Sequence, residues 1–189
     1  MFQGSYFRQV GNKLNPGLPD LLKDFSPDKE AAVLDIGAGN LRDAQYCLQY
    51  GFKKIVAVDN EPQCLQFAKP GITYCIQPIQ QYSIPADQYS MVLGCNALFF
   101  LSPEDLMALF PRIFQGLKKN GIFFFNLLGE EDGWVKFNAH PSGTRVYSSN
   151  QELIGRLFSG FRMEFQTEDL GYDENGFCRH VISFVLSKP

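Results

Sequence analysis

The stretch from Ala32 to Asn40 limits the possible folds of this chain more than any other part of the sequence. It reads Ala-Val-Leu-Asp-Ile-Gly-Ala-Gly-Asn, an apolar run with an acidic residue, followed by two glycines one residue apart. This pattern predicts a buried strand, a sharp turn and then a helix. Glycine lets a ligand approach main-chain N–H groups, and the start of a helix offers unpaired donors and a positive dipole end. The junction therefore fits a small anionic or zwitterionic cofactor.

A second strand pattern, residues 54–59, ends on another carboxylate, Asp59. It follows the first strand by about twenty residues, the place where α/β nucleotide sites hold ribose hydroxyls. Further strands are predicted at 72–76, 89–95 and 121–128, and helices at 41–50, from Glu61 to Pro70, and from Ser102 to a stop at 118–121. Alternation of this kind favours a parallel sheet with right-handed crossovers.

The two ends of the chain complete one domain over residues 1–189. After an irregular insert at 129–144, a helix is predicted at 152–158, and strand patterns at 161–168 and 179–186 predict a closing antiparallel pair. Near the start, Leu18, Leu21, Leu22 and Phe25 form one apolar face of a short helix. Residues 1–27 are therefore either a helical lid over the cofactor or a cap packed on the edge of the sheet.

The composition of the chain argues against several classes of binding partner. The net charge of −3, the pI near 5.4 and the scattered Lys and Arg residues argue against nucleic acid. No apolar run approaches the roughly 20 residues that span a bilayer, and the first residues lack the features of a signal peptide, so we expect a cytoplasmic protein without a membrane partner, as a monomer or homodimer. Five cysteines without a C-x-x-C pair, and two histidines, predict neither disulfides nor a metal site.

Two residues near the glycine turn also indicate which class of cofactor fits this junction. A dinucleotide turn has a third glycine where this chain has Arg42, and Asp35 at the strand tip would repel a pyrophosphate. An amine-bearing ligand fits better, because Asp35 can hold an ammonium group directly or through water while Asp59 accepts two hydroxyls. S-adenosylmethionine carries all of these groups.

Several segments together resemble class I S-adenosylmethionine-dependent methyltransferases over nearly the whole chain. These are residues 33–39, the strand ending at Asp59, residues 89–93 and the turn at 118–121. Residues 37–43, 98–101 and 168–189 are similar to the small tellurite-resistance-type methyltransferases. The resemblance implies an α/β fold with a Rossmann-like, doubly wound, seven-stranded and mostly parallel sheet, whose last strand is antiparallel.

The resemblance also implies the cofactor contacts. The methionine part would be surrounded by Asp35, Gly37, Ala38 and Gly39, and the ribose would be bound by Asp59 with Asn60 nearby. The adenine would lie beside Ile79 or Gln80, and the floor near the methyl group would be lined by Gly94, Cys95 and Asn96. Many members place an aspartate for the adenine amino group where this chain has Gln77, which can substitute as an acceptor. Leu41 replaces a common glycine, and its side chain can face the core.

The sequence says less about the methyl acceptor than about the cofactor. Methyl transfer from a sulfonium mainly needs an aligned nucleophile and a dry site, so a strong catalytic motif is not required. Residues 95–98 lack the Asn/Asp-Pro-Pro-aromatic sequence of enzymes that methylate DNA bases or glutamine, which favours a small-molecule acceptor. Candidate substrate or catalytic residues are Tyr6, Asp132, Trp134, Arg179 and His180. His180 could act as a base or orient an anionic acceptor, or it could be a strand histidine satisfied by a neighbour. Trp134 could likewise be a core aromatic. A catalytically silent S-adenosylmethionine-binding or regulatory protein is the alternative.

Overall fold

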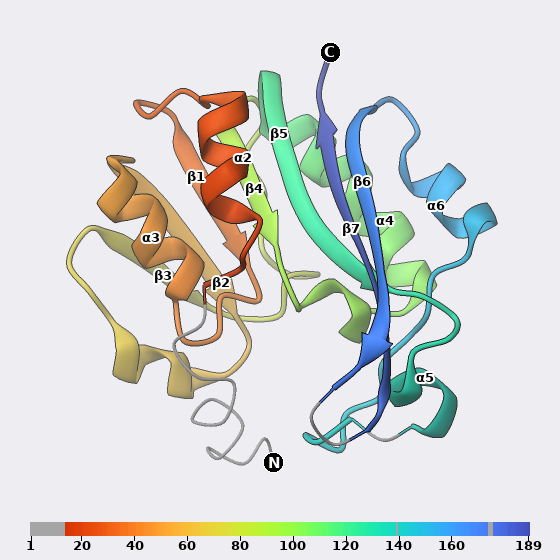
Figure 1. Cartoon of the computed structure of the whole chain (residues 1–189). Coiled ribbons are helices and arrows are strands. Elements are labelled where there is room, and N and C mark those ends of the chain that lie inside the picture. Colours follow the sequence, from red (N-terminus) through yellow and green to blue (C-terminus); the bar gives the residue numbers. More distant parts are fainter. Residues whose placement is uncertain (1–13, 139, 174–175) are drawn as a thin grey trace.

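A computed structural model describes residues 14–138, 140–173 and 176–189 of the chain (Figure 1). Their strands form one sheet of seven in the order β3-β2-β1-β4-β5-β7-β6. β7 runs antiparallel to both β5 and β6, and the remaining neighbours are parallel. This confirms the predicted fold class. The strands are β1 (Ala32–Ile36), β2 (Lys54–Asp59), β3 (Ile72–Ile76), β4 (Tyr89–Gly94), β5 (Leu117–Leu128), β6 (Arg162–Tyr172) and β7 (Cys178–Ser187).

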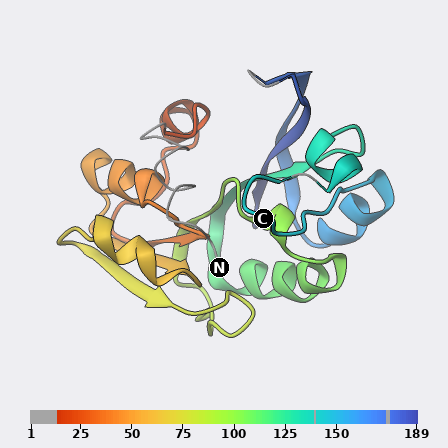
Figure 2. The same cartoon turned by 90° about the horizontal axis from the view of Figure 1, so that it is seen from below.

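Helices cover both faces of the sheet, as a doubly wound fold requires (Figure 2). The apolar sides of α2 and α3 pack on one face, and those of α4 and α6 pack on the other. No helix among the described residues has both the length and the apolar character needed to cross a membrane. The helices are α2 (Leu18–Phe25), α3 (Arg42–Tyr50), α4 (Pro103–Gly116), α5 (Gly133–Phe137) and α6 (Gln151–Leu157), with 3-10 turns η1 (Pro62–Phe67) and η2 (Leu98–Phe100).

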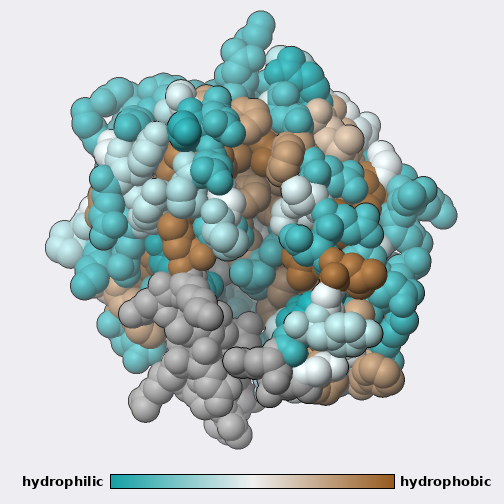
Figure 3. Space-filling model, in the orientation of Figure 1, coloured by the Kyte–Doolittle hydropathy of each residue, from teal (hydrophilic) through white to brown (hydrophobic). Residues whose placement is uncertain are grey.

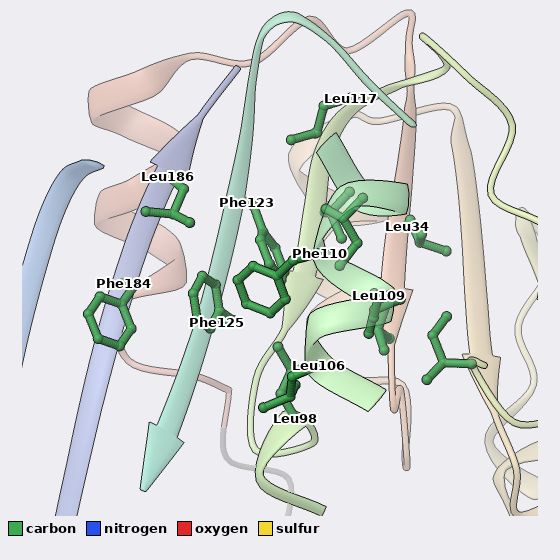
Figure 4. Packing of buried hydrophobic residues seen from close by; sticks show 14 of the residues in the cluster. Leu34, Leu98, Leu106, Leu109, Phe110, Leu117, Phe123, Phe125, Phe184 and Leu186 are labelled. Carbon is green, nitrogen blue, oxygen red and sulfur yellow. The ribbon is translucent and has the colours of Figure 1, made fainter. Parts of the chain in front are cut away.

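Phenylalanine rings fill the core between the sheet and α4 (Figure 4). Phe110 of α4 lies 5.3 Å, between ring centroids, from both Phe123 and Phe125 of β5. Phe124 points to the opposite face and packs with α2 and α3. Because successive strand residues face opposite sides, the apolar run in β5 is buried on both faces, as its sequence predicted. Aromatic pairs in such geometry contribute about 0.5–1.5 kcal/mol each beyond area burial.

Two helix boundaries differ from prediction. The helix expected from Glu61 to Pro70 is only the 3-10 turn η1, and Ala68 is already extended. Pro70 restricts the residues before it, so an α-helix cannot continue there. The helix expected to reach 118 ends at Gly116, where an added Cβ would lie 2.4 Å from the side chain of Ile84. β5 begins at Leu117, before the predicted stop, because Leu117 pairs with Tyr89 of β4.

Helix α2 packs on the sheet beside β1 and β5. Leu18, Leu21 and Leu22 are buried in one cluster with Val33 and Phe124. The helix thus lies on the face of the sheet over interior strands rather than at the sheet edge, and the roles predicted for residues 1–27 stay predictions. Tyr6 lies outside the described residues.

Strand β6 forms one edge of the sheet and is mostly exposed. In the orientation of Figure 1, the molecular surface carries apolar patches within a largely hydrophilic face (Figure 3). The exposed apolar side chains of β6 are Met163, Phe165, Leu170 and Tyr172.

Candidate functional site

The residues predicted to bind the cofactor gather where β1, β2 and β4 end. These strands are parallel neighbours, so their carboxyl ends lie together at the lower edge of the sheet in Figure 1. The turn after β1 contacts the ends of both neighbours: Gly39 is bonded to Asp59 of β2, and Gly37 packs against Ala97 beyond β4. The topology therefore brings three separate sequence motifs into one site.

The turn after β1 depends on left-handed backbone at three positions. Gly37 has φ +67°, Gly39 has φ +51° and Leu41 has φ +65°. A Cβ on Gly37 would lie 2.3 Å from the Cβ of Ala97. Gly37 is thus required both for its backbone conformation and for the close approach of the turn to the segment after β4. The side chain of Leu41 is fully buried, as expected for a residue that replaces a glycine there.

The main-chain donors of this turn are already used within the protein. The N–H groups of Gly37 and Ala38 donate to the carbonyl of Val58 at 2.8 and 3.3 Å. The N–H of Gly39 donates to Oδ2 of Asp59 at 2.7 Å. The expectation that these groups are open to a ligand is therefore wrong, because β2 ends beside the turn and supplies the acceptors. The turn offers a shaped surface rather than free donors.

Asp59 is held in a fixed orientation. Its Oδ2 accepts from Gly39, and its Oδ1 accepts from the N–H of Glu61 at 2.8 Å. Burial raises the pKa of this carboxyl, while the N–H groups of Glu61 and Gly39 oppose the rise. A carboxylate has about four lone-pair sites, so both oxygens can still accept hydroxyl hydrogens. Neighbouring Asn60 is exposed.

Asp35 is a buried carboxyl group whose hydrogen-bonding capacity is only partly satisfied. It is 4% exposed, and it accepts a hydrogen bond from the N–H of Ala44 in the first turn of α3. Its Oδ2 has no hydrogen-bond partner among the described residues. Burial, then the charges of Asp43 and Asp59, raise its pKa well above the ordinary range. A buried oxygen without a donor is destabilising, and the ammonium group of an amino-acid ligand would satisfy it. The site therefore fits the predicted cofactor.

The segment after β4 is fixed by an asparagine pair. Asn96, with φ +55°, donates its N–H to Oδ1 of Asn126 at 2.6 Å, and Asn126 Nδ2 donates to Oδ1 of Asn96 at 2.9 Å. Asn126 is 5% exposed, whereas Asn96 is exposed. Sequence reasoning missed Asn126. Its signal was a single polar residue in the apolar run of β5. Gly94 and Cys95 lie beside this pair in the chain, in the predicted floor.

Replacing Asn126 by leucine, which has the same number of side-chain heavy atoms and the same branching but removes both hydrogen bonds, should destabilise the fold by about 1–3 kcal/mol because the N–H of Asn96 loses its partner. Urea denaturation measures this. Equal stability of Asn126→Leu and the wild type would show that the pair does not hold this segment.

The residues predicted near the adenine lie in the loop after β3. Gln77 donates its N–H to the carbonyl of Asp59 at 2.9 Å, which ties this loop to the end of β2. Ile79 is buried and Gln80 is exposed. Arg112 of α4 donates to the carbonyls of Ile79 and Gln80, at 3.5 and 3.3 Å. The loop is therefore anchored from both sides.

Four of the candidate acceptor-side residues meet near the end of β5. Asp132 is fully buried and accepts from Trp134 N at 2.9 Å, which caps α5. Its Oδ2 accepts from Arg179 Nε and from the N–H of His180, both at 3.0 Å. The Arg179 guanidinium lies 3.3 Å from the centroid of the Trp134 ring. Asp132 thus joins α5 to the start of β7.

The two described histidines are both engaged. His180 Nε2 lies 2.6 Å from Oε1 of Glu168, and its Nδ1 accepts from the N–H of Glu131 at 3.3 Å. This assigns the ring proton to Nε2 when the imidazole is neutral. His140 packs edge-on against Trp134, with ring centroids 4.4 Å apart. Burial, together with the charge of Arg179, lowers the pKa of His140 to about 4, so it is neutral at pH 7.

Comparison with known proteins gives one family model and one curated relative that match part of the chain. Residues 33–121 match the family model of a methyltransferase domain. A curated relative, carboxy-S-adenosyl-L-methionine synthase of Photorhabdus laumondii, is 31% identical over 104 residues. That match covers 49% of this chain and 41% of the relative, so the chain spans less than half of the relative's length.

Solved structures of methyltransferases share the fold. One is an S-adenosylmethionine-dependent methyltransferase from Mesorhizobium loti, with TM-score 0.74, 16% identity and coverage of 94% of this chain and 100% of that one. Another is 1,6-didemethyltoxoflavin-N1-methyltransferase from Burkholderia thailandensis, bound to 1,6-didemethyltoxoflavin and S-adenosylhomocysteine. Its TM-score is 0.71 at 18% identity, with coverage of 99% and 83%.

Proposed function

We propose that the protein transfers a methyl group from S-adenosyl-L-methionine to a small-molecule acceptor, which the match of residues 33–121 to a methyltransferase domain and the shared fold support. The observation that carries the proposal is the buried oxygen of Asp35 beside the glycine turn, which has no hydrogen-bond partner in the part of the chain that the structure describes, with Asp59 fixed at the end of the next strand. The finer assignment, to enzymes of the small tellurite-resistance type acting in the cytoplasm, is part of the same proposal. Five free thiols support a reducing compartment.

In this proposal, the residues at the strand ends hold the two polar parts of the cofactor. Asp35 would bind the ammonium group, and Asp59 would accept hydrogen bonds from the ribose hydroxyls. S-adenosyl-L-methionine, when bound, supplies a methyl group on a positively charged sulfur. The chain then needs to align an acceptor with that carbon and exclude water, which can contribute several kcal/mol without acid–base groups. The segment Gly94–Asn96, held by Asn126, would form the floor of the reacting centre.

Two observations support the proposal that the methyl acceptor is a small molecule. The acidic composition gives no footprint for a polyanion, and residues 95–98 lack a base-flipping enzyme's Asn/Asp-Pro-Pro-aromatic sequence. The Burkholderia enzyme, whose fold this chain shares, acts on a small heterocycle according to its name. We therefore propose a small organic or inorganic acceptor.

A binding protein without turnover is the second candidate. It is favoured by one observation: Asp132 has no exposed surface, and both ring nitrogens of His180 have partners, so neither is free to act as a base. Incubation with methyl-labelled S-adenosyl-L-methionine and a cell extract separates the candidates. Label in a small metabolite indicates the enzyme, whereas cofactor binding without transfer indicates the binding protein.

Replacing Asp59 by alanine should weaken S-adenosylhomocysteine binding by about 10–100-fold, since the ribose hydroxyls lose a charged acceptor. Calorimetric titration measures this. Asp87→Ala, an exposed carboxylate near the opposite end of β4, is the matched control and should bind normally. Undiminished binding by Asp59→Ala would contradict the ribose placement, and no binding by the wild type at millimolar ligand would contradict the cofactor itself.

A further inference from the structure

A second carboxylate, Asp43, lies beside Asp35 in the candidate site. Asp43 is in the first turn of α3 and is 8% exposed, while Asp35 reaches the same turn by accepting from Ala44. Oδ1 of Asp43 accepts from the N–H of Asn15 at 3.2 Å, and the thiol of Cys95 hydrogen-bonds to the same carboxyl group. Asp43 thus touches three elements around the site: the segment before α2, helix α3 and the end of β4.

The charges around Asp35 are unbalanced. Asp43 and Asp59 face it from α3 and β2, and Arg42 of α3 is the cation that favours its charged form. Cys47 and Cys95 also face it from α3 and β4, and burial raises the pKa of both thiols, so they stay neutral. Buried carboxyl groups this close do not all ionise without compensation; one keeps a proton or a cation enters.

An ammonium group has the right chemistry to complete this cluster. It is a compact cation with three donors, and Asp35 Oδ2 is a buried acceptor without a partner among the described residues. Resting on the proposed function, we propose that Asp35 and Asp43 together form the pocket for the cofactor's ammonium group, and that a proton held by this pair leaves when the ammonium enters. Asp43, which sequence reasoning did not select, becomes a cofactor-binding residue.

This pairing predicts a definite pH dependence. Burial raises the pKa of Asp43 as well as that of Asp35, so the free protein retains a proton at a pH where isolated carboxyls are ionised. Because the ammonium binds the deprotonated pair, affinity for S-adenosylhomocysteine should rise as pH increases toward the raised pKa, then level off above it. Below that range, the proton competes with the ligand.

The test is calorimetric titration of the full chain with S-adenosylhomocysteine in two buffers of different ionisation enthalpy, between about pH 5.5 and 8. The wild type should release up to about one proton per ligand. Asp43→Asn keeps the shape and the acceptor for Asn15; it should bind about tenfold more weakly and release less of this proton. Asp87→Asn, an exposed control, should match the wild type in both measurements.

A ligand without the ammonium group separates this inference from a general loss of binding. Methylthioadenosine lacks the amino-acid part, so its affinity should be equal in the wild type and Asp43→Asn, with no proton released. Binding of S-adenosylhomocysteine without proton release, or with full affinity in Asp43→Asn, would overturn the two-carboxylate pocket and leave the proposed function standing. Failure of the wild type to bind S-adenosylhomocysteine would overturn the proposed function itself. The proton count of the wild type does not depend on the variant folding.

Discussion

Replacement of Gly37 by alanine is expected to remove measurable cofactor binding and to destabilise the fold by about 2–5 kcal/mol. The new Cβ would lie 2.3 Å from the Cβ of Ala97, and the φ of +67° is unfavourable for any side chain. Either the turn or the segment after β4 must move, and both line the candidate site. A displacement of about 1 Å can lower productive binding about 100-fold. Urea denaturation and titration with S-adenosylhomocysteine measure the two effects.

Two controls isolate the contact with Ala97. Gly143 has φ +72° and nothing within 4 Å of an added Cβ, so Gly143→Ala should lose only the conformational part, about 1–2 kcal/mol, and bind the ligand normally. The double variant Gly37→Ala, Ala97→Gly removes the opposing methyl group and should recover part of the lost stability and binding. If Gly37→Ala is no less stable than Gly143→Ala, the close approach has no importance.

The positions of Asp35 and Asp59 could be predicted because they follow from strand order. Each ends an apolar run, and parallel neighbours present their carboxyl ends at one edge. The use of the main-chain donors could not be predicted in the same way. Gly37 and Ala38 find the carbonyl of Val58 only because β2 ends level with the turn, and register between strands is not written in either segment alone.

Asn126 and Asp43 show what sequence reasoning misses. Each is a polar residue within an apolar or helical pattern, and its role appears only when a partner from another element is known. Asn126 meets a residue 30 positions away, and Asp43 meets Asn15, 28 positions away. The α4 boundary failed for a related reason, since the chain leaves the helix where Leu117 pairs with Tyr89 of β4, a partner from another element.

Asp132 was selected from the sequence as an acceptor-side candidate, and the structure places it at the centre of a buried network. Its carboxylate accepts from Trp134, Arg179 and His180, and it has no exposed surface. The two partners in β7 are 47 and 48 residues away, and they reach Asp132 only through the antiparallel pairing of β5 and β7. Its main effect should therefore be on stability.

Asp132→Ala should lower the free energy of unfolding by about 3–5 kcal/mol, because Arg179 keeps its charge in a mostly buried position without a partner and α5 loses its cap. Asp132→Asn retains an acceptor for the N–H of Trp134 or His180 and should lose less. Denaturant unfolding followed by circular dichroism measures both. Glu131→Ala is the matched control: Glu131 is the adjacent acid, exposed and paired with Lys136, and should leave stability unchanged.

Cofactor binding distinguishes a structural role from a catalytic one. The hydrogen bonds of Asp132 go to α5 and β7 rather than to the ends of β1 and β2, so folded Asp132→Asn should bind S-adenosylhomocysteine as the wild type does. The opposite result would be a lower rate of methyl transfer to an identified acceptor in Asp132→Asn, with the same stability as the wild type. That result would show that the carboxylate acts on the acceptor and that its hydrogen bonds do not stabilise the fold. Loss of stability together with intact binding is the result that the hydrogen bonds to Arg179 and His180 lead us to expect, since they join α5 and β7 rather than face a ligand.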